Sequence, residues 1–244
     1  AVVTGGSRGI GRAIADGLAG AGAAVVPAAR TAEDVETVAE TIRDAGGEAH
    51  AATVDVTDTE SVEALIDEAV DTFGGVDVVL NNAGVNPDPA LGRPERVDIE
   101  DGFDFTVDVN LRGAFACAQA SASHLAADGG SLINVASVGG LVGLPRQHPY
   151  VASKHGLVGL TKSMALDWAP DVRVNAIAPG YVATDLIEDA MDDEGIRQSL
   201  LDRTPLERFA EPSEIAGPAV FLASDAASYV TGSVLSVDGG WTSR

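Results

Sequence analysis

The chain opens with Val2-Val3-Thr4-Gly5-Gly6-Ser7-Arg8-Gly9-Ile10-Gly11, a short apolar run that leads into a glycine-rich turn. The apolar residues predict a buried strand, and an amphipathic stretch near 10–21 predicts the helix that follows it. Glycines at 5, 9 and 11 allow a tight turn and a close approach of the backbone to a ligand. Because a helix N-terminus offers free N–H groups and the positive end of the helix dipole, this turn suits a phosphate. Its spacing differs from the commoner dinucleotide fingerprint, so the turn alone does not identify the ligand.

Apolar, strand-like runs alternate with amphipathic helical patterns along the rest of the chain. This alternation predicts an α/β fold, doubly wound, with a parallel sheet and helices on both faces. Pro27 is awkward in the second run, because proline lacks the N–H that a central strand donates, and we expect a bulge or a late start of that strand. Strands are expected at Val2–Thr4, Ala24–Ala29, Ala49–Val54, Val76–Leu80, Ser131–Ala136, Val172–Ile177 and Ser233–Val237, and helices near 10–21, 32–45, 59–72, 102–127, 150–169 and 212–223.

Tyr150 and Lys154 lie four residues apart in an expected helix, and Ser137 follows an expected strand. The spacing puts a phenol and an ammonium group on one helix face, one turn apart. A phenol, a hydroxyl and a cation together indicate proton transfer to a developing alkoxide. In isolation, Ser137 would be interpreted as a strand-end cap and the Tyr–Lys pair as a chance arrangement on a solvated helix.

Further motifs follow in a fixed order: Asn81-Asn82-Ala83-Gly84, Asn110, Ser137, Tyr150 with Lys154, and Asn175-Ala176-Ile177-Ala178-Pro179-Gly180. With Thr4 to Gly11, this order resembles the short-chain dehydrogenase/reductase family over essentially the whole chain. The resemblance implies a single dinucleotide-binding catalytic domain over residues 1–244, with a Rossmann fold. It implies a seven-stranded parallel sheet in the order 3-2-1-4-5-6-7, with the cofactor at the carboxyl ends of the strands. It also implies an NAD(P)-dependent oxidoreductase that interconverts a secondary alcohol and a ketone.

The resemblance implies four catalytic residues. Tyr150 is the general acid/base, and Ser137 hydrogen-bonds the reacting oxygen. Lys154 binds the nicotinamide ribose. Its charge and the positive nicotinamide of the cofactor are together expected to lower the pKa of the Tyr150 phenol from near 10. Asn110 helps to hold a water that relays protons; alone, it would be interpreted as a helix-kink residue.

The resemblance also implies the contacts of the dinucleotide. The glycine turn binds the pyrophosphate, Asp55 accepts a hydrogen bond from the adenine amino group, and the Pro179-Gly180 turn covers the nicotinamide. Asn81, considered alone, fits a purely structural role. The expected cofactor-binding residues are Gly5, Ser7, Arg8, Gly9, Ile10, Gly11, Arg30, Thr31, Asp55, Val56, Asn82, Ala83, Gly84, Tyr150, Lys154, Pro179, Gly180, Val182 and Thr184.

The choice of cofactor depends on the end of the second strand. A preference for NAD normally requires a carboxylate there, which accepts a hydrogen bond from the ribose 2′-hydroxyl. This chain has Arg30 and Thr31 instead, with no acid until Glu33. Arg30 and Arg8 can form charge-assisted hydrogen bonds with a 2′-phosphate. We therefore expect NADP(H), with NAD(H) as the alternative because arginine also recognises neutral groups.

The chain is strongly acidic, with 37 acidic and 15 basic residues, a formal net charge of −22 and a pI near 4.2. Such a charge disfavours nucleic acid and anionic membranes as partners. The only lysines are Lys154 and Lys162. Lysine depletion combined with excess acid predicts a halophilic protein, because molar salt screens repulsion beyond about 3 Å. An acidic protein from an ordinary environment is the alternative.

Other sequence features argue against particular kinds of site and segment. Cys117 is the only cysteine, so an intramolecular disulfide and a cysteine metal cluster are both excluded, and we expect no metal site. No apolar run is long enough to span a bilayer, and the strand expected at Val2 leaves no room for a signal peptide. We expect a cytoplasmic protein, and the family resemblance implies a homotetramer.

The substrate is a small molecule that the sequence constrains weakly. A helical lid is expected at about 183–209. Gly139-Gly140-Leu141-Val142 and Arg146-Gln147-His148 are expected to line the pocket with it. The segment Leu160–Pro170 and the later Thr204–Phe209 are similar to gluconate and other sugar dehydrogenases and also to 3-oxoacyl-acyl carrier protein reductases. We expect a sugar acid, polyol or sugar, with a 3-oxoacyl thioester of acyl carrier protein or CoA as the alternative. A dinucleotide-sensing regulator without turnover is a remote alternative.

Overall fold

The computed structural model describes residues 1–187 and 191–243. Its strands form one parallel sheet in the order β3-β2-β1-β4-β5-β6-β7, which confirms the predicted doubly wound fold. Because all strands run in one direction, their carboxyl ends meet at one edge of the sheet. The strands are β1 (Val2–Thr4), β2 (Val26–Ala29), β3 (Ala52–Thr53), β4 (Val78–Asn81), β5 (Ser131–Val135), β6 (Arg173–Pro179) and β7 (Val234–Val237).

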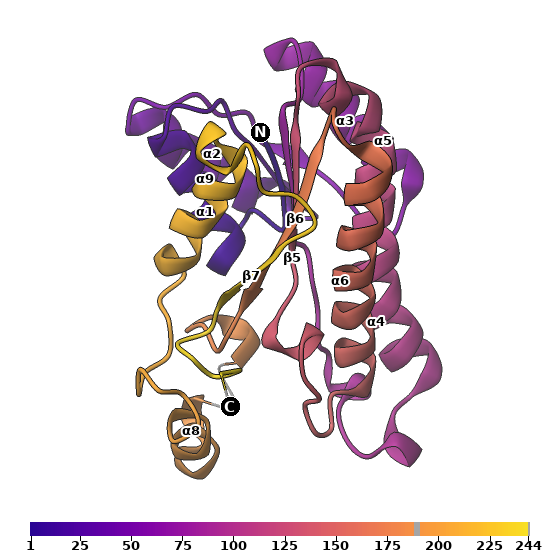
Figure 1. Cartoon of the computed structure of the whole chain (residues 1–244), viewed down its shortest axis with the longest axis vertical. Coiled ribbons are helices and arrows are strands. Elements are labelled where there is room, and N and C mark those ends of the chain that lie inside the picture. The colour runs from indigo at the N-terminus through magenta and orange to yellow at the C-terminus, as the bar shows by residue number, and fades with distance from the viewer. Residues whose placement is uncertain (188–190, 244) are drawn as a thin grey trace.

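Helices cover both faces of the sheet (Figure 1). On one face lie α1 (Gly9–Gly20), α2 (Ala32–Asp44) and α9 (Ser213–Ala223), and α1 and α9 pack with Ile14 and Ile215 in one apolar cluster. On the other face lie α3 (Thr59–Phe73), α5 (Gly113–Ala127) and α6 (His148–Trp168), whose cluster includes Leu65 and Leu125. No helix in the described part of the chain is both long and apolar enough to cross a membrane.

Pro27 lies inside β2, in register with Val3 of β1. The pairing of β2 with its other neighbour is interrupted at this point. An isolated bridge joins Val25 to Ala49, and the ladder resumes only at Ala28 with Ala52. The missing N–H of Pro27 therefore costs no ladder hydrogen bond, which explains both the proline and the late start and short length of β3.

The helix expected at 102–127 begins earlier and is broken. It consists of the π-helix η3 (Ile99–Asp104), a single α-turn α4 (Phe105–Val107), a second π-helix η4 (Asp108–Arg112) and then α5. A side chain on Gly102 would lie 2.4 Å from the carbonyl oxygen of Pro89, so this segment packs closely on the loop after β4. The second π-helix carries Asn110, and π-turns of this kind are frequent at functional sites.

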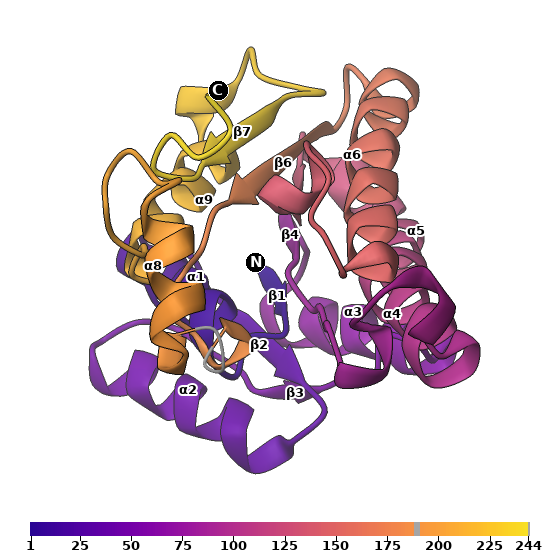
Figure 2. The ribbon, with the colours of Figure 1, turned by 90° about the horizontal axis from the view of Figure 1, so that it is seen from below.

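The lid region extends from the body beyond β6. It contains the short 3₁₀ helix η6 (Asp185–Ile187) and α8 (Glu194–Leu201), and residues 188–190 of the expected lid lie outside the described residues. Its two ends are joined by a parallel bridge between Val182 and Ala210. In Figure 1, α8 lies beyond the end of the sheet, and Figure 2 shows it from below on the side of α1 and α2.

Candidate active site

The glycine turn between β1 and α1 has no room for side chains. Gly5 and Gly9 have positive φ angles of 64° and 51°, which favour glycine. A Cβ on Gly11 would lie 2.1 Å from the carbonyl oxygen of Gly5. No described side chain caps the N-terminus of α1, and its first turn contains no acid. This open, positively polarised helix end fits the pyrophosphate of a dinucleotide.

Thr4 fixes the loop after β4 against this turn. Its Oγ1 accepts hydrogen bonds from the N–H groups of Asn82 and Ala83, at 3.1 and 3.2 Å. In return, Nδ2 of Asn82 donates to the carbonyl oxygens of Thr4 and Gly5, at 3.0 and 3.1 Å. The two predicted cofactor-binding segments, the glycine turn and 82–84, are therefore held side by side.

Asn81 has a structural role, which was one of the interpretations of its position in the sequence. Its Nδ2 donates to Oδ1 of Asn134 at 2.9 Å and to the carbonyl oxygen of Ala114 at 3.0 Å. Nδ2 of Asn134 then donates to Oγ1 of Thr161 in α6, also at 2.9 Å. This buried polar chain ties α5, β4, β5 and α6 together and so positions the helix that carries Tyr150.

The ends of β2 and β3 bring Arg30 and Asp55 close together. Two hydrogen bonds from Thr57, one from its N–H and one from its hydroxyl, lower the pKa of Asp55, and the charge of Arg30 acts in the same direction against the effect of burial. Arg30 is exposed and has no ion pair within the described residues. Its guanidinium is therefore accessible to an anionic ligand.

Arg8 is not free, in contrast to Arg30. It forms an ion pair with Asp185 of η6 at 3.1 Å, with the two side chains 79% and 68% exposed. Thr184, another predicted cofactor-binding residue, lies beside the turn, because a Cβ on Gly9 would be 3.2 Å from its Cγ2. The first residues of the lid therefore contact the glycine turn directly.

Ser137 and Tyr150 lie next to each other at the end of β5. Ser137 caps the 3₁₀ helix η5 (Val138–Gly140), accepting a hydrogen bond from the N–H of Gly139 at 3.0 Å. Burial raises the pKa of the half-buried Tyr150, while a hydrogen bond with Ser137 opposes this shift. A phenol that stays protonated and is bonded to a hydroxyl can deliver a proton to a carbonyl oxygen.

Lys154 is buried one helical turn after Tyr150. Its Nζ lies 5.7 Å from the centre of the Tyr150 ring and donates to the carbonyl oxygen of Val135 at 2.8 Å. Burial lowers the pKa of Lys154 to about 8. For the protein chain alone, burial is the largest influence on Tyr150 and raises its pKa. The expected lowering, which also requires the positive charge of a bound nicotinamide, stays a prediction.

Asn110 clamps the backbone of the loop after β4. Its Oδ1 accepts from the N–H of Val85 at 2.7 Å, and its Nδ2 donates to the carbonyl oxygen of Val85 at 2.9 Å. Nδ2 also donates to Oγ of Ser153 at 3.2 Å. A Cβ on Gly84 would lie 3.4 Å from Oδ1 of Asn110 and 3.5 Å from Nζ of Lys154. Asn110, Lys154 and the loop thus form one cluster.

The remaining predicted cofactor residues lie on other segments of the fold. Pro179 ends β6, and Gly180 packs so closely on the following segment that a Cβ would lie 2.8 Å from Cα of Asp238. Ile10 is partly buried and packs against the apolar core. The others are Ser7 in the glycine turn, Thr31 at the N-cap of α2, and Val56, which is buried against Gly113.

Four residues near the site were missed, or only partly recognised, in the sequence. Thr4 was recognised as part of a motif but not as the residue that holds Asn82. Tyr181 stacks edge-on against Trp241 with ring centres 5.8 Å apart, and Arg203 lies 4.4 Å above the Trp241 ring. Aromatic residues just after the Pro179-Gly180 turn and near the C-terminus were the available signal, but spacing does not predict that they meet.

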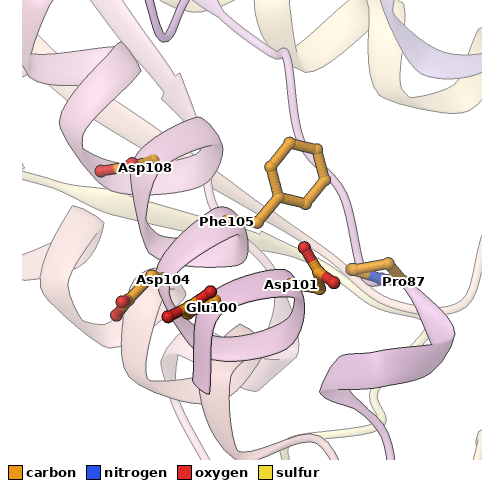
Figure 3. A pocket seen from close by; sticks show the side chains of 6 residues that line it. All are labelled: Pro87, Glu100, Asp101, Asp104, Phe105 and Asp108. Carbon is orange, nitrogen blue, oxygen red and sulfur yellow. The ribbon is translucent and has the colours of Figure 1, made fainter. Parts of the chain in front are cut away.

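A separate surface hollow of about 480 Å³ is lined by Pro87, Glu100, Asp101, Asp104, Phe105 and Asp108. The carboxylates come from the broken helix, and Asp101 and Phe105 face Pro87 (Figure 3). It contains none of the predicted site residues. Over residues 1–187 and 191–243, no cluster of three or more His, Cys, Asp or Glu side chains could hold a metal ion.

Comparisons with known proteins agree with this geometry. A family model described as enoyl-(acyl carrier protein) reductase matches residues 5–242. The chain is 44% identical over 243 residues to a 3-oxoacyl-[acyl-carrier-protein] reductase of Staphylococcus aureus, covering 98% of this chain and 96% of the relative. It is 40% identical over 248 residues to 2-dehydro-3-deoxy-D-gluconate 5-dehydrogenase of Escherichia coli, covering 100% and 95%. A crystal structure of gluconate 5-dehydrogenase from Burkholderia cenocepacia, in complex with NADP and tartrate, matches with a TM-score of 0.94 and 40% identity, covering 100% of this chain and 94% of that one.

Proposed function

The chain belongs to the short-chain dehydrogenase/reductase family and is an oxidoreductase, and from this premise we propose that it reduces a ketone of a sugar acid, or oxidises the corresponding alcohol, with NADP(H). The observation that carries the proposal is the contact of Ser137 and Tyr150 one helical turn from the buried Lys154. We propose that residues 1–244 form one catalytic domain, with 183–209 as its lid.

Each of the four residues has one task in this mechanism. NADP(H), when bound, supplies or accepts the hydride. Tyr150 transfers the proton to or from the reacting oxygen, and Ser137 hydrogen-bonds that oxygen as charge develops on it. Lys154 places a cation beside the phenol and carries donors that suit ribose hydroxyls. Asn110 keeps the loop at Val85 in place next to them.

The glycine turn, the segment 82–84 and the exposed Arg30 are the groups that would hold the cofactor. Uncapped N–H groups at the start of α1 suit the pyrophosphate, and Arg30 suits a 2′-phosphate. Pro179, Gly180, Val182 and Thr184 border the same edge of the sheet. The bound NADP of the Burkholderia cenocepacia relative supports this choice of cofactor.

A sugar acid as substrate is supported by a cation in the aromatic wall of the site. Arg203 stacks on Trp241, and Trp241 packs on Tyr181. Tyr181 lies near enough to Tyr150 to contribute to the raised pKa of that phenol. A guanidinium held in this way can form bidentate hydrogen bonds with a carboxylate. Two relatives named for gluconate-type substrates agree with this assignment.

Reduction of a 3-oxoacyl thioester is the second candidate, and the 44% identical Staphylococcus aureus reductase favours it. The charge of the chain argues against it. With a net charge of −22 and acids such as Asp193 and Glu194 at the start of α8, the lid side would repel a polyanionic carrier. A non-catalytic sensor is disfavoured because Ser137, Tyr150, Lys154 and Asn110 are all present in one site.

Three properties of the whole protein also belong to this proposal. Adaptation to concentrated salt accounts for the net charge of −22 with only two lysines. A cytoplasmic location fits a cofactor-dependent reductase whose single cysteine, Cys117, is buried as a free thiol. A homotetramer would cover the apolar side chains of Phe115 on α5 and Leu166 on α6, which are 47% and 83% exposed.

Steady-state kinetics in molar KCl test the substrate and the cofactor together. NADPH and NADH are compared with 5-ketogluconate and with acetoacetyl-CoA as the oxidised substrates. We expect the highest kcat/KM for 5-ketogluconate with NADPH. A preference for acetoacetyl-CoA would assign the enzyme to acyl metabolism, and a preference for NADH would contradict the role of Arg30.

A further inference from the structure

Two amide side chains meet beside the site: Gln147, which was expected to line the substrate pocket, and Asn86. Nδ2 of Asn86 donates to Oε1 of Gln147 at 3.3 Å. Oδ1 of Asn86 is buried and has no hydrogen-bond partner anywhere in residues 1–187 or 191–243. A buried acceptor without a partner is unfavourable, and in a functional site it indicates a ligand that completes its bonding.

Backbone contacts place both amides beside the catalytic group. Asn86 follows Val85, whose N–H and carbonyl are both held by the Asn110 side chain. Gln147 is the N-cap residue of α6, and its carbonyl oxygen accepts from the N–H of Val151, so it lies just before the turn that carries Tyr150. The amide pair therefore lies on the two segments that flank Asn110 and Tyr150.

The turn before α6 is built to present Gln147. Arg146 has a φ angle of 61°, in the left-handed region that residues other than glycine rarely adopt. The carbonyl oxygen of Arg146 accepts from the N–H of Gly92, which ties this turn to the loop after β4. A strained residue held by a neighbouring loop is typical of a site where side-chain direction matters.

We propose that Asn86 and Gln147 together bind a hydroxyl group on the carbon next to the reacting carbonyl. The hydroxyl donates to Oδ1 of Asn86 and accepts from Nε2 of Gln147, so both of its hydrogen-bonding functions are used. The bond between the two amides joins Nδ2 of Asn86 to Oε1 of Gln147, so it uses neither of the two atoms that bind the hydroxyl. This inference rests on the proposed function and gives its substrate class: ketones that carry a neighbouring hydroxyl.

The pair would also reject the competing substrate class. In a 3-oxoacyl thioester the carbons on either side of the keto carbon bear no hydroxyl; in acetoacetyl-CoA they are a methyl and a methylene group. Neither can donate a hydrogen bond to Oδ1 of Asn86. A site whose buried polar group stays unpaired discriminates strongly against such an analogue. The amide pair thus explains how a chain similar to acyl reductases would prefer a sugar acid.

The test measures the ratio of kcat/KM for 5-ketogluconate to that for acetoacetyl-CoA, with NADPH, in the full-length protein. Asn86→Leu removes the acceptor at similar volume, and Asn86→Asp retains an acceptor. We expect the ratio to fall on the order of tenfold in Asn86→Leu and to stay near the wild-type value in Asn86→Asp. Binding of NADPH, followed by fluorescence, reports whether each variant is folded.

Gln147→Met is a second variant, which removes the Nε2 donor of Gln147. If Asn86→Leu does not fold, Gln147→Met is expected to lower the same ratio. An unchanged ratio in a folded Asn86→Leu or Gln147→Met variant would overturn the role of the amide pair. A wild-type enzyme that reduces only acetoacetyl-CoA would instead refute the proposed sugar-acid substrate.

Discussion

Nζ of Lys154 donates a hydrogen bond to the main-chain carbonyl oxygen of Val135 at 2.8 Å, inside the protein and away from any carboxylate in the described residues. The residue is only 4% exposed, and burial lowers its pKa to about 8 from 10.5. A buried lysine of this kind costs stability in order to place a cation near Tyr150. The hydrogen bond to β5 fixes where that cation lies.

Replacement of Lys154 by methionine is expected to stabilise the fold and abolish turnover. Between pH 8 and 10.5 the unfolded chain binds more protons at this residue than the folded chain, so stability rises with pH across that range. Below about pH 8 the full cost of burial is present. The free energy of unfolding of Lys154→Met at pH 7 should therefore increase by about 1–3 kcal/mol, allowing for the lost hydrogen bond.

Urea unfolding at pH 7 and pH 10.5, at one salt concentration, measures this effect. The difference in stability between Lys154→Met and the wild type should shrink at the higher pH. An advantage of the variant that is the same at both pH values would contradict a lowered pKa of Lys154.

Two glycines of α1 should respond in opposite ways to alanine. A Cβ on Gly11 would lie 2.1 Å from the carbonyl oxygen of Gly5, so Gly11→Ala must displace the turn and should destabilise the protein by roughly 1–3 kcal/mol. A Cβ on Gly20 meets nothing within 4 Å, and Gly20→Ala should be neutral or stabilising by up to about 1 kcal/mol. Thermal unfolding of both variants makes the comparison, and equal effects would refute the close packing of the turn.

Arg30→Gln should reduce the preference for NADPH over NADH. Loss of a charge-assisted contact with the 2′-phosphate should raise KM for NADPH about tenfold and leave KM for NADH nearly unchanged. Arg43→Gln is the matched control, because Arg43 is an exposed arginine of α2 that pairs with Glu36 and is not assigned to the cofactor. If both cofactors lose affinity equally in Arg30→Gln, the residue has a general structural role.

Stability should depend steeply on salt. With a net charge of −22, repulsion among surface carboxylates destabilises the folded chain at low ionic strength, and the screening length falls from about 10 Å at 0.1 M to about 3 Å at 1 M. The midpoint of thermal unfolding, measured by circular dichroism, should therefore rise continuously as KCl is raised from about 0.1 M to about 1 M. A midpoint independent of KCl would contradict salt adaptation.

Alternation of strands and helices predicts a parallel sheet and permits few topologies. The particular strand order was predictable from the family resemblance. Element ends were less predictable where tertiary contacts decide them. Pro27 interrupts the pairing of β2 with β3, so β3 is reduced to Ala52–Thr53. The helix expected at 102–127 follows a periodic apolar pattern, but that pattern does not reveal the π-turn at Asn110, whose side chain bonds to Val85 across the fold.

The site was predictable where residue type and local spacing are sufficient. Tyr150 and Lys154 share a helix face, so their proximity follows from the sequence. The direction of the pKa shift of Tyr150 depends on burial, which local spacing does not give. The ion pair of Arg8 with Asp185 and the contact of Asn86 with Gln147 join residues 177 and 61 positions apart, so only the folded chain reveals them.

The most direct test of the account is the turnover of Tyr150→Phe, which removes one hydroxyl from the site. Because a positioned general acid contributes about 10²- to 10⁴-fold to the rate, kcat for 5-ketogluconate reduction should fall by that factor. Binding of NADPH, measured by fluorescence, should persist and show that the site is intact. Turnover of a folded Tyr150→Phe variant at the wild-type rate would contradict the assignment of Tyr150 as the proton donor.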